Sequence, residues 1–162
     1  MNQPPSVVAI RLAEPADAAA IAQLMQAEPA FWHPSWSPEL IARTLAASTT
    51  IAFVTLAAAE PETVPLLASP AVQTQPTPPI AGFACAHNLG FRGYLSELIV
   101  APSSRGQGHA SALLAVIEQR LADEGCPLII ADVWRAAQEF YRQQGWTPPD
   151  AVLLRKHLPP AT

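Results

Sequence analysis

Apolar residues recur along this chain with two spacings, one typical of strands and one typical of helices. Short apolar runs rich in β-branched and aromatic residues predict four strands in the first hundred residues, at 7–12, 50–56, 80–87 and 94–100. Turn residues between the last two runs favour an antiparallel meander of the last three strands. Between the first two strands, apolar residues recur at helical spacing from Ala18 to Met25 and from Leu40 to Leu45, which predicts two helices.

The ends of both predicted helices carry recognisable signals. Pro15 falls in the first turn of the first helix, and Pro29 cannot continue that helix. Ser37 can cap the second helix with its hydroxyl, and Pro38 then occupies the first helical position. The two helices should therefore be short and separate, joined by residues 31–36.

A third amphipathic block follows the meander and ends before Gly125, a residue that favours helix C-termini. Its apolar positions repeat at spacings of three and four: Ala110, Leu113, Leu114, Ile117 and Leu121. Residues 127–133 are apolar except for Asp132, which is typical of a strand covered on both faces. Residues 136–144 predict a short helix ending at Gly145, and residues 151–158 predict a closing strand.

The resulting order is β-α-α-β-β-β-α-β-α-β, which predicts a mixed α/β sheet. A chain of 162 residues and 17.2 kDa with 50% hydrophobic residues can build one core, so we expect a single domain over 1–162. One segment interrupts the pattern: residues 57–79 contain six prolines, which leave little room for regular structure. We interpret 57–79 as a flexible insertion and assign it no role.

Charge and hydropathy narrow the classes of partner. The formal net charge is −4, the isoelectric point is near 5.5, and the nine basic residues are scattered, which argues against nucleic-acid binding. Neither a basic start followed by an apolar segment nor a run of about 18 apolar residues occurs. We therefore expect a cytoplasmic protein that does not associate with a membrane.

The cysteines and histidines do not have the spacing of a metal site. Cys85 and Cys126 lie far apart without a Cys-x-x-Cys pattern, and the four histidines form no ligand-spaced pair. Both cysteines border or occupy apolar strand patterns, which favours buried free thiols over a disulfide. The sequence therefore predicts no metal.

The stretch from Arg105 to Ala110 contains two glycines and lies between an apolar strand and an amphipathic helix. The first backbone N–H groups of a helix have no partner within it, and the helix dipole places partial positive charge there. Glycines allow the backbone to approach a ligand closely, and Arg105 adds a full charge. The stretch therefore predicts a site for a phosphate or pyrophosphate; the alternative is a turn with no ligand.

Two common phosphate-binding motifs fit this stretch poorly. A P-loop requires Lys and then Ser or Thr after its last glycine, whereas His109 stands directly after Gly108. A dinucleotide-binding Rossmann unit would need a glycine where Ser111 stands, and the 30 residues after Asp132 are too few for its remaining repeats.

The glycine stretch resembles the cofactor motif of the GNAT superfamily of N-acetyltransferases: Arg or Gln, two residues, Gly, one residue, then Gly or Ala. Arg105, Gly108 and Ala110 match it, within the longer context Glu97-Leu-Ile-Val-Ala-Pro-Ser-Ser-Arg-Gly-Gln-Gly-His-Ala and before Ala137-Gln-Glu-Phe-Tyr-Arg-Gln-Gln-Gly-Trp146. The resemblance covers nearly the whole chain outside 57–79. It implies a mixed sheet of six to seven strands flanked by about four helices.

The resemblance also implies acetyl-CoA as the donor substrate, bound between two splayed parallel strands, here 95–100 and 127–133. Pantetheine would pair with the backbone of Leu98, Ile99 and Val100. The backbone of the glycine stretch would hold the pyrophosphate, through Arg105, Gly106, Gln107, Gly108, His109, Ala110 and Ser111. Trp134 departs from the pattern, because many relatives carry Asn there.

Tyr141 and Glu97 are the candidate catalytic residues. Tyr141 matches the family's tyrosine near the thioester sulfur, where a phenol of pKa about 10 could donate to a thiolate of pKa about 8.5 at a cost of roughly 2 kcal/mol. Glu97 is the acidic residue in the strand before the glycine stretch. A carboxylate of pKa near 4.3 is too weak a base to act unaided, so Glu97 would work through a water, through a raised pKa or by orienting the ammonium; the alternative is a strand carboxylate that faces solvent.

In the family, the segment between the first two helices often walls the acceptor site. Phe31, Trp32 and Trp36 lie in that segment, where they could hold a cation or pin the loop to the core. The resemblance thus implies an acetyl-CoA-dependent N-acetyltransferase, with direct attack by a small-molecule or peptide primary amine in a ternary complex. The alternative is a non-catalytic acyl-CoA-binding module. The acceptor and the oligomeric state stay open, and a homodimer is compatible with the sequence.

Overall fold

A computed structural model of the chain describes residues 8–57, 78–149, 154 and 156. The chain divides into two compact units, Met1–Ile130 and Ala131–Thr162. The predicted 57–79 insertion and the predicted strand at 151–158 lie largely outside the described residues. The interpretation of 1–162 as a single domain stays a prediction.

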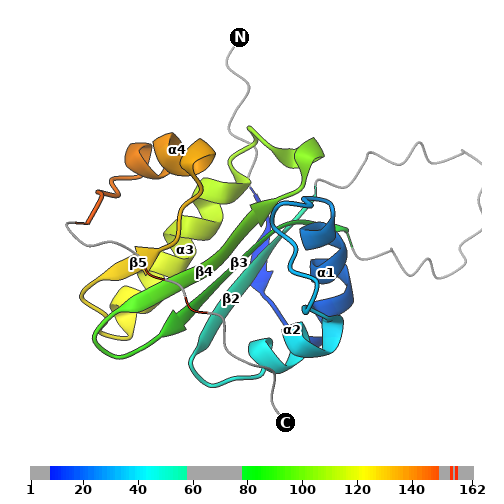
Figure 1. Ribbon diagram of the computed structural model, residues 1–162, viewed down its shortest axis with the longest axis horizontal. Helices are drawn as coiled ribbons and strands as arrows, with labels where there is room; N and C mark the ends of the chain where they lie inside the picture. Colours follow the sequence, from blue (N-terminus) through cyan, green and yellow to red (C-terminus); the bar gives the residue numbers. More distant parts are fainter. Residues whose placement is uncertain (1–7, 58–77, 150–153, 155, 157–162) are drawn as a thin grey trace, which may run out of the picture. The chain divides into compact units, whose positions relative to one another are not determined.

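The first unit is built on the sheet, whose strand order is β1-β2-β3-β4-β5 (Figure 1). The strands are β1 (Ile10–Leu12), β2 (Thr50–Leu56), β3 (Ile80–Asn88), β4 (Gly93–Val100) and β5 (Ile129–Ala131), the last of which ends at the first residue of the second unit. The helices are α1 (Ala18–Gln26), α2 (Pro38–Leu45) and α3 (His109–Asp123). The strands β1 to β4 are each antiparallel to their neighbours, which confirms the predicted meander.

The helices of this unit cover the two faces of the sheet. Successive strand residues point to opposite faces. On β3, Phe83 and Cys85 belong to the apolar cluster that α1 and α2 bury against the sheet. A side chain at the adjacent Gly82 would instead meet Leu113 of α3 at 3.1 Å. Helices α1 and α2 therefore lie on one face of the sheet and α3 on the other.

The local signals at the helix ends act as the sequence predicts. The Leu40 N–H donates to the Ser37 hydroxyl at 3.2 Å, and Pro38 is the first residue of α2. Gly125 ends α3 with φ +81°. The Gly125 and Cys126 N–H groups donate to carbonyls of the last turn, each at 2.9 Å, which is the Schellman arrangement.

The structure describes five strands, against the six to seven predicted, and the predicted strand at 151–158 lies largely outside the described residues. One sequence prediction about the sheet is wrong. The strand predicted at 127–133 shortens to β5, because Pro127 has no N–H for a strand ladder. It is not covered on both faces either, since Leu128 and Ile130 are 56% and 36% exposed. A run of apolar residues shows that a segment is hydrophobic, but here it does not show that both faces of the strand are buried.

The second unit contains a 3₁₀ turn at Arg135–Ala137 and the helix α4 (Gln138–Gln143), as the sequence predicts for 136–144. Gly145 ends this helix with φ +87°. The Trp146 N–H donates to the Tyr141 carbonyl at 3.0 Å, a second Schellman contact.

In the part of the chain that the structure describes, no helix is both long and apolar enough to span a membrane.

Candidate active site

A β-bulge in β4 sets the direction of Glu97. Cys85 of β3 pairs with Glu97, whereas the next residue, Ala86, pairs with Leu95, so Ser96 is an extra residue in β4. The Ser96 hydroxyl donates to the Cys85 carbonyl oxygen at 3.2 Å and also contacts Glu97 Oε2. Bulges redirect side chains at functional sites. This bulge directs Glu97 toward the face that α1 and α2 cover.

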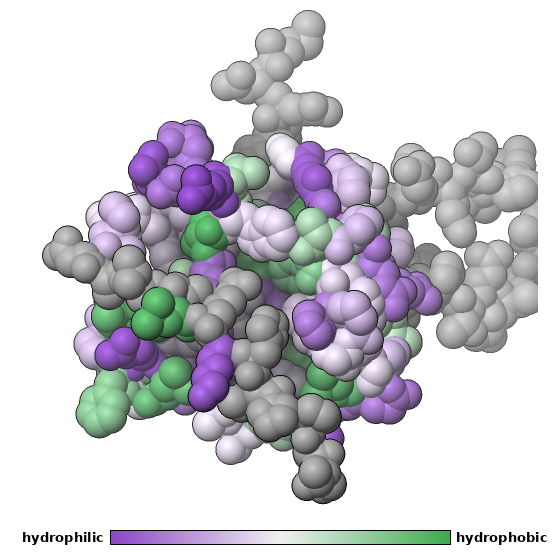
Figure 2. Space-filling model, viewed as in Figure 1, coloured by the Kyte–Doolittle hydropathy of each residue, from purple (hydrophilic) through white to green (hydrophobic). Residues whose placement is uncertain are grey.

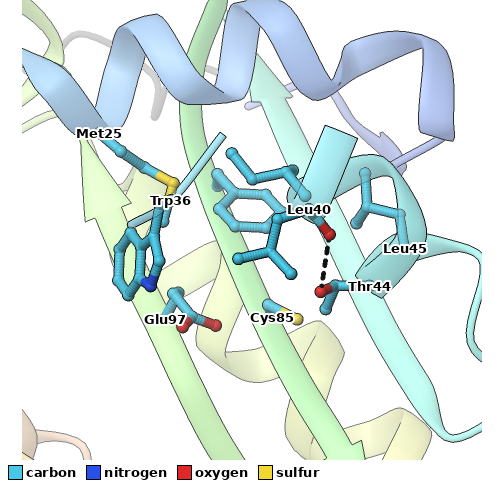
Figure 3. Close-up of a pocket in the computed structure, with 9 residues that line it drawn as sticks. Met25, Trp36, Leu40, Thr44, Leu45, Cys85 and Glu97 are labelled. Atoms are coloured by element: carbon cyan, nitrogen blue, oxygen red, sulfur yellow. Dashed lines mark hydrogen bonds between the residues drawn. The ribbon is translucent and has the colours of Figure 1, made fainter. Parts of the chain in front are cut away.

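Glu97 lines a pocket of about 110 Å³ in the first unit, between the sheet and the helices α1 and α2 (Figure 3). The other lining residues are Met25, Trp36, Leu40, Ile41, Thr44, Leu45, Phe83 and Cys85. Figure 3 shows Trp36 beside Glu97 at one end of the pocket and Leu45 at the other. Of the two positions that the sequence leaves open for Glu97, the structure has the carboxylate in this pocket rather than on a solvent-facing surface.

Burial changes the acid–base properties of the groups around Glu97. It raises the pKa of the Glu97 carboxyl, and hydrogen bonds from Ser96 and Cys85 offset part of this increase. Burial raises the pKa of the Cys85 thiol to about 12, and the nearby Glu97 charge adds to the effect. Glu97 is therefore a stronger base than an exposed carboxylate, and Cys85 stays a neutral thiol.

The strand pairing also brings Cys85, His87 and Glu97 together, with potential ligand atoms all within 4.8 Å of one another. Spacings along the chain do not indicate this group, because its members meet only when β3 and β4 pair. Burial lowers the pKa of His87, and its Nδ1 lies 3.3 Å from Thr50 Oγ1. Both cysteines are free thiols, as predicted, but Cys126 is only partly buried.

The glycine stretch forms an open turn before α3. Gly106 and Gly108 have φ of +74° and +89°, conformations that favour glycine, and within the described part of the chain no atom beyond their chain neighbours lies within 4 Å of where their Cβ would be. Gly108 is the N-cap of the 15-residue helix α3, and no side chain caps this end. The first N–H groups of α3 are therefore available to an anion, which fits the predicted pyrophosphate site.

Two side chains of this stretch, Arg105 and His109, do not offer a free positive charge to an anion. Arg105 donates to Glu28 at 2.8 Å and to the Val100 carbonyl at 3.3 Å, so its charge is already paired. His109 is 5% exposed, and its Nδ1 has no partner among the described residues. Burial lowers the pKa of His109, which favours the neutral imidazole. The positive potential of this site thus comes mainly from the backbone.

The three strand residues predicted to contact pantetheine, Leu98, Ile99 and Val100, pair on one side with β3. On the other side, β5 has three residues against eight in β4. The Gly93 N–H donates to the Leu128 carbonyl at 2.8 Å, so this contact lies at the start of β4, away from residues 98–100. An extended ligand could therefore reach backbone groups at the end of β4.

Tyr141 lies on α4, in the second unit, whereas Glu97 and the glycine turn belong to the first unit. Its ring packs edge-on against Phe140 and Trp146, with both centroid distances 5.2 Å. Burial raises the pKa of Tyr141 to about 12. The phenol is therefore protonated at all physiological pH values.

Comparison with known proteins decides the family. Residues 21–146 match the model of the acetyltransferase (GNAT) family. The chain belongs to the GNAT family of acetyltransferases. This GNAT chain is 15% identical to ribosomal-protein-alanine N-acetyltransferase from Brucella melitensis biovar Abortus 2308, with a TM-score of 0.67 and coverage of 93% of this chain and 100% of that one.

Two further solved structures share the fold. Glucosamine-6-phosphate N-acetyltransferase from Arabidopsis thaliana is 16% identical, with a TM-score of 0.68 over 95% of this chain and 100% of that one. An aminoglycoside N-acetyltransferase in complex with CoA is 16% identical, with a TM-score of 0.65 over 97% and 99%. These proteins are named for a ribosomal-protein alanine, glucosamine-6-phosphate and an aminoglycoside, so the shared fold does not identify an acceptor.

Proposed function

We propose that this GNAT protein transfers an acetyl group from acetyl-CoA to a primary amine by direct attack in a ternary complex. The observation that carries the proposal is the position of Glu97, a partly buried carboxylate that a bulge directs into a pocket. The uncapped helix start at Gly108 supports donor binding within the same unit. The family and the CoA complex of an aminoglycoside N-acetyltransferase with the same fold support acetyl-CoA as the donor.

The donor pyrophosphate would be held by backbone N–H groups from Arg105 to Ser111, and pantetheine by the backbone of residues 98–100. Arg105 would exchange Glu28 for a phosphate, or would stay with Glu28 and hold the turn against the end of α1. Both partners of this ion pair are about half exposed, so the pair contributes about 1 kcal/mol or less. Either arrangement is energetically accessible.

Glu97 would take the proton that the amine must lose. At pH 7, removing the proton from an alkylammonium of pKa about 10.4 costs roughly 4.6 kcal/mol. The buried position of Glu97 raises the pKa of its carboxyl, which reduces the mismatch between base and ammonium. The amine nitrogen then attacks the acetyl carbonyl carbon, the C–N bond forms and the C–S bond breaks.

Tyr141 is proposed to stabilise the departing thiolate. Because the pKa of Tyr141 is about 12, full proton transfer to a thiolate of pKa about 8.5 would cost on the order of 5 kcal/mol. This is more than the roughly 2 kcal/mol expected for a phenol of pKa about 10. We therefore assign to Tyr141 a hydrogen bond to the sulfur rather than complete proton transfer. Solvent would supply the final proton.

The test is CoA release from acetyl-CoA by the purified protein, followed with a thiol reagent in the presence and absence of amines. The proposal predicts thiol release that depends on an amine and falls in Glu97→Gln. Binding of CoA without amine-dependent release would favour the alternative, a non-catalytic acyl-CoA-binding module.

The free thiols Cys85 and Cys126 support a reducing compartment, and we propose the cytoplasm as the site of action.

A further inference from the structure

The pocket next to Glu97 has a distinctive chemical composition. Seven of its nine lining residues are apolar or aromatic or carry a thiol: Met25, Trp36, Leu40, Ile41, Leu45, Phe83 and Cys85. The Thr44 hydroxyl donates its proton to the Leu40 carbonyl at 3.0 Å, and it carries no charge. Glu97 is therefore the single carboxylate in the lining, as far as the described residues go.

This charge pattern suits one ammonium group and disfavours several. An ammonium at Glu97 would find an opposite charge and, beside it, the indole ring of Trp36 (Figure 3). A second ammonium further into the pocket would lie against Leu40, Ile41 and Leu45 with no second carboxylate among the lining residues, and a buried unpaired charge is costly. The pocket thus matches an acceptor with one positive charge and an apolar body.

The size of the pocket limits that body. A cavity of about 150 Å³ lined by apolar side chains accommodates benzene. The pocket here measures about 110 Å³. It suits a short alkyl chain or part of a single ring, whereas several linked sugar rings would extend well beyond it.

We propose that the acceptor is a primary monoamine with a short apolar body, whose nitrogen binds at Glu97 and whose body lies against Leu40, Ile41 and Leu45. This inference rests on the proposed function. In the reaction, the bound ammonium loses one proton to Glu97, its nitrogen bonds to the acetyl carbon, a second proton leaves the nitrogen for solvent, and the carbon–sulfur bond breaks with its electron pair on the sulfur, which is then protonated. The products are an N-alkylacetamide and CoA.

The first test compares acceptors with the full-length protein. The probes are n-butylamine to n-octylamine, benzylamine, spermidine and kanamycin, each with acetyl-CoA, and kcat/KM is taken from thiol release. The proposal expects kcat/KM to increase about fourfold per methylene, the equivalent of 0.8 kcal/mol, until the pocket is full. Preference for spermidine or kanamycin would overturn the inference and leave the proposed function intact.

The second test changes the depth of the pocket. Leu40→Ala should move the optimum of the alkylamine series to longer chains by two or three carbons. The control is Leu89→Ala, because Leu89 is 56% exposed and lies at the turn from β3 to β4, where Figure 2 shows apolar residues at the surface. An unchanged optimum in Leu40→Ala would overturn the assignment of the pocket.

A binding measurement separates the two proposals. Calorimetric titration of n-hexylamine without acetyl-CoA should give binding that Glu97→Gln weakens at least tenfold and Leu89→Ala leaves unchanged. Binding with this pattern but without turnover would refute the acetyltransferase proposal and keep the pocket assignment. Turnover of amines with no dependence on chain length would refute the pocket assignment alone.

Discussion

Replacing Glu97 by Gln should produce an activity loss that depends strongly on pH. Gln keeps the size of the side chain and a hydrogen-bonding oxygen for Ser96, but it cannot accept a proton from the amine. The variant can then use only amine that is already unprotonated in solution. For an amine of pKa about 10.4, that is about one molecule in 2,500 at pH 7 and about three in ten at pH 10.

The loss of kcat/KM should shrink as pH rises, because the fraction of unprotonated amine increases. We expect kcat/KM of Glu97→Gln to be about 10²- to 10³-fold lower than that of the unmodified protein at pH 7, a normal range for loss of a general base. Near pH 10 the difference should shrink to about tenfold or less. The assay is amine-dependent thiol release from pH 6 to 10, with Asp123→Asn as control because it removes a carboxylate at the exposed end of α3.

The same substitution has a second, opposite effect on stability. The folded-state pKa of Glu97 lies above its unfolded value because burial disfavours the carboxylate. The stability of the unmodified protein therefore falls as pH rises from the unfolded pKa, about 4.3, through the folded pKa. Gln does not ionise, so Glu97→Gln should have the higher Tm at pH 7 and lose this advantage below pH 4. An activity loss that is constant across pH, together with a lower Tm at pH 7, would refute the reasoning.

Three further predictions concern the donor site and the second unit. Tyr141→Phe should lower kcat by about tenfold or more with little change in the KM for acetyl-CoA, as expected for a hydrogen bond made only to the departing thiolate; an equal rise in KM would argue against it. Gly108→Ala should lower the free energy of unfolding by about 1–2 kcal/mol, because φ is +89° there, and should weaken CoA binding in calorimetry. Glu28→Gln should release Arg105 and tighten CoA binding two- to fivefold at low salt, and unchanged affinity would show that Arg105 does not reach the phosphates.

Much of the first unit could be predicted from sequence because its signals are local. The Ser37 cap and the glycine after α3 each act within one turn of chain. The strands of the meander followed from short apolar runs with turn residues between them. Such features depend on a few neighbouring residues, and no tertiary contact overrides them here.

The features that the sequence could not provide depend on contacts between distant segments. The bulge at Ser96 appears only when β4 is paired with β3, and it determines which way Glu97 points. The grouping of Cys85, His87 and Glu97 has the same origin. The ion pair of Arg105 with Glu28 joins residues 77 positions apart, and it changes Arg105 from a free cation to a paired one.

The pocket could not be predicted from the sequence either. The sequence is compatible with Trp36 as a cation-binding or a loop-anchoring residue, and in the structure it packs against the core and also lines the pocket. The apolar residues of α2 predicted a helix face, yet a helix face does not reveal whether the sheet fills the space beneath it. Only the packed structure gives the volume that limits the acceptor.

The central claim is that Glu97 and its pocket serve acetyl transfer to an amine. The most direct measurement is the yield of N-hexylacetamide by mass spectrometry alongside released CoA, from acetyl-CoA and n-hexylamine at pH 7, for the unmodified protein, Glu97→Gln and Asp123→Asn. We predict amide and thiol in a one-to-one ratio for the unmodified protein and Asp123→Asn, and at least a hundredfold less of both for Glu97→Gln. Amide formation at equal rates in all three proteins would contradict the claim.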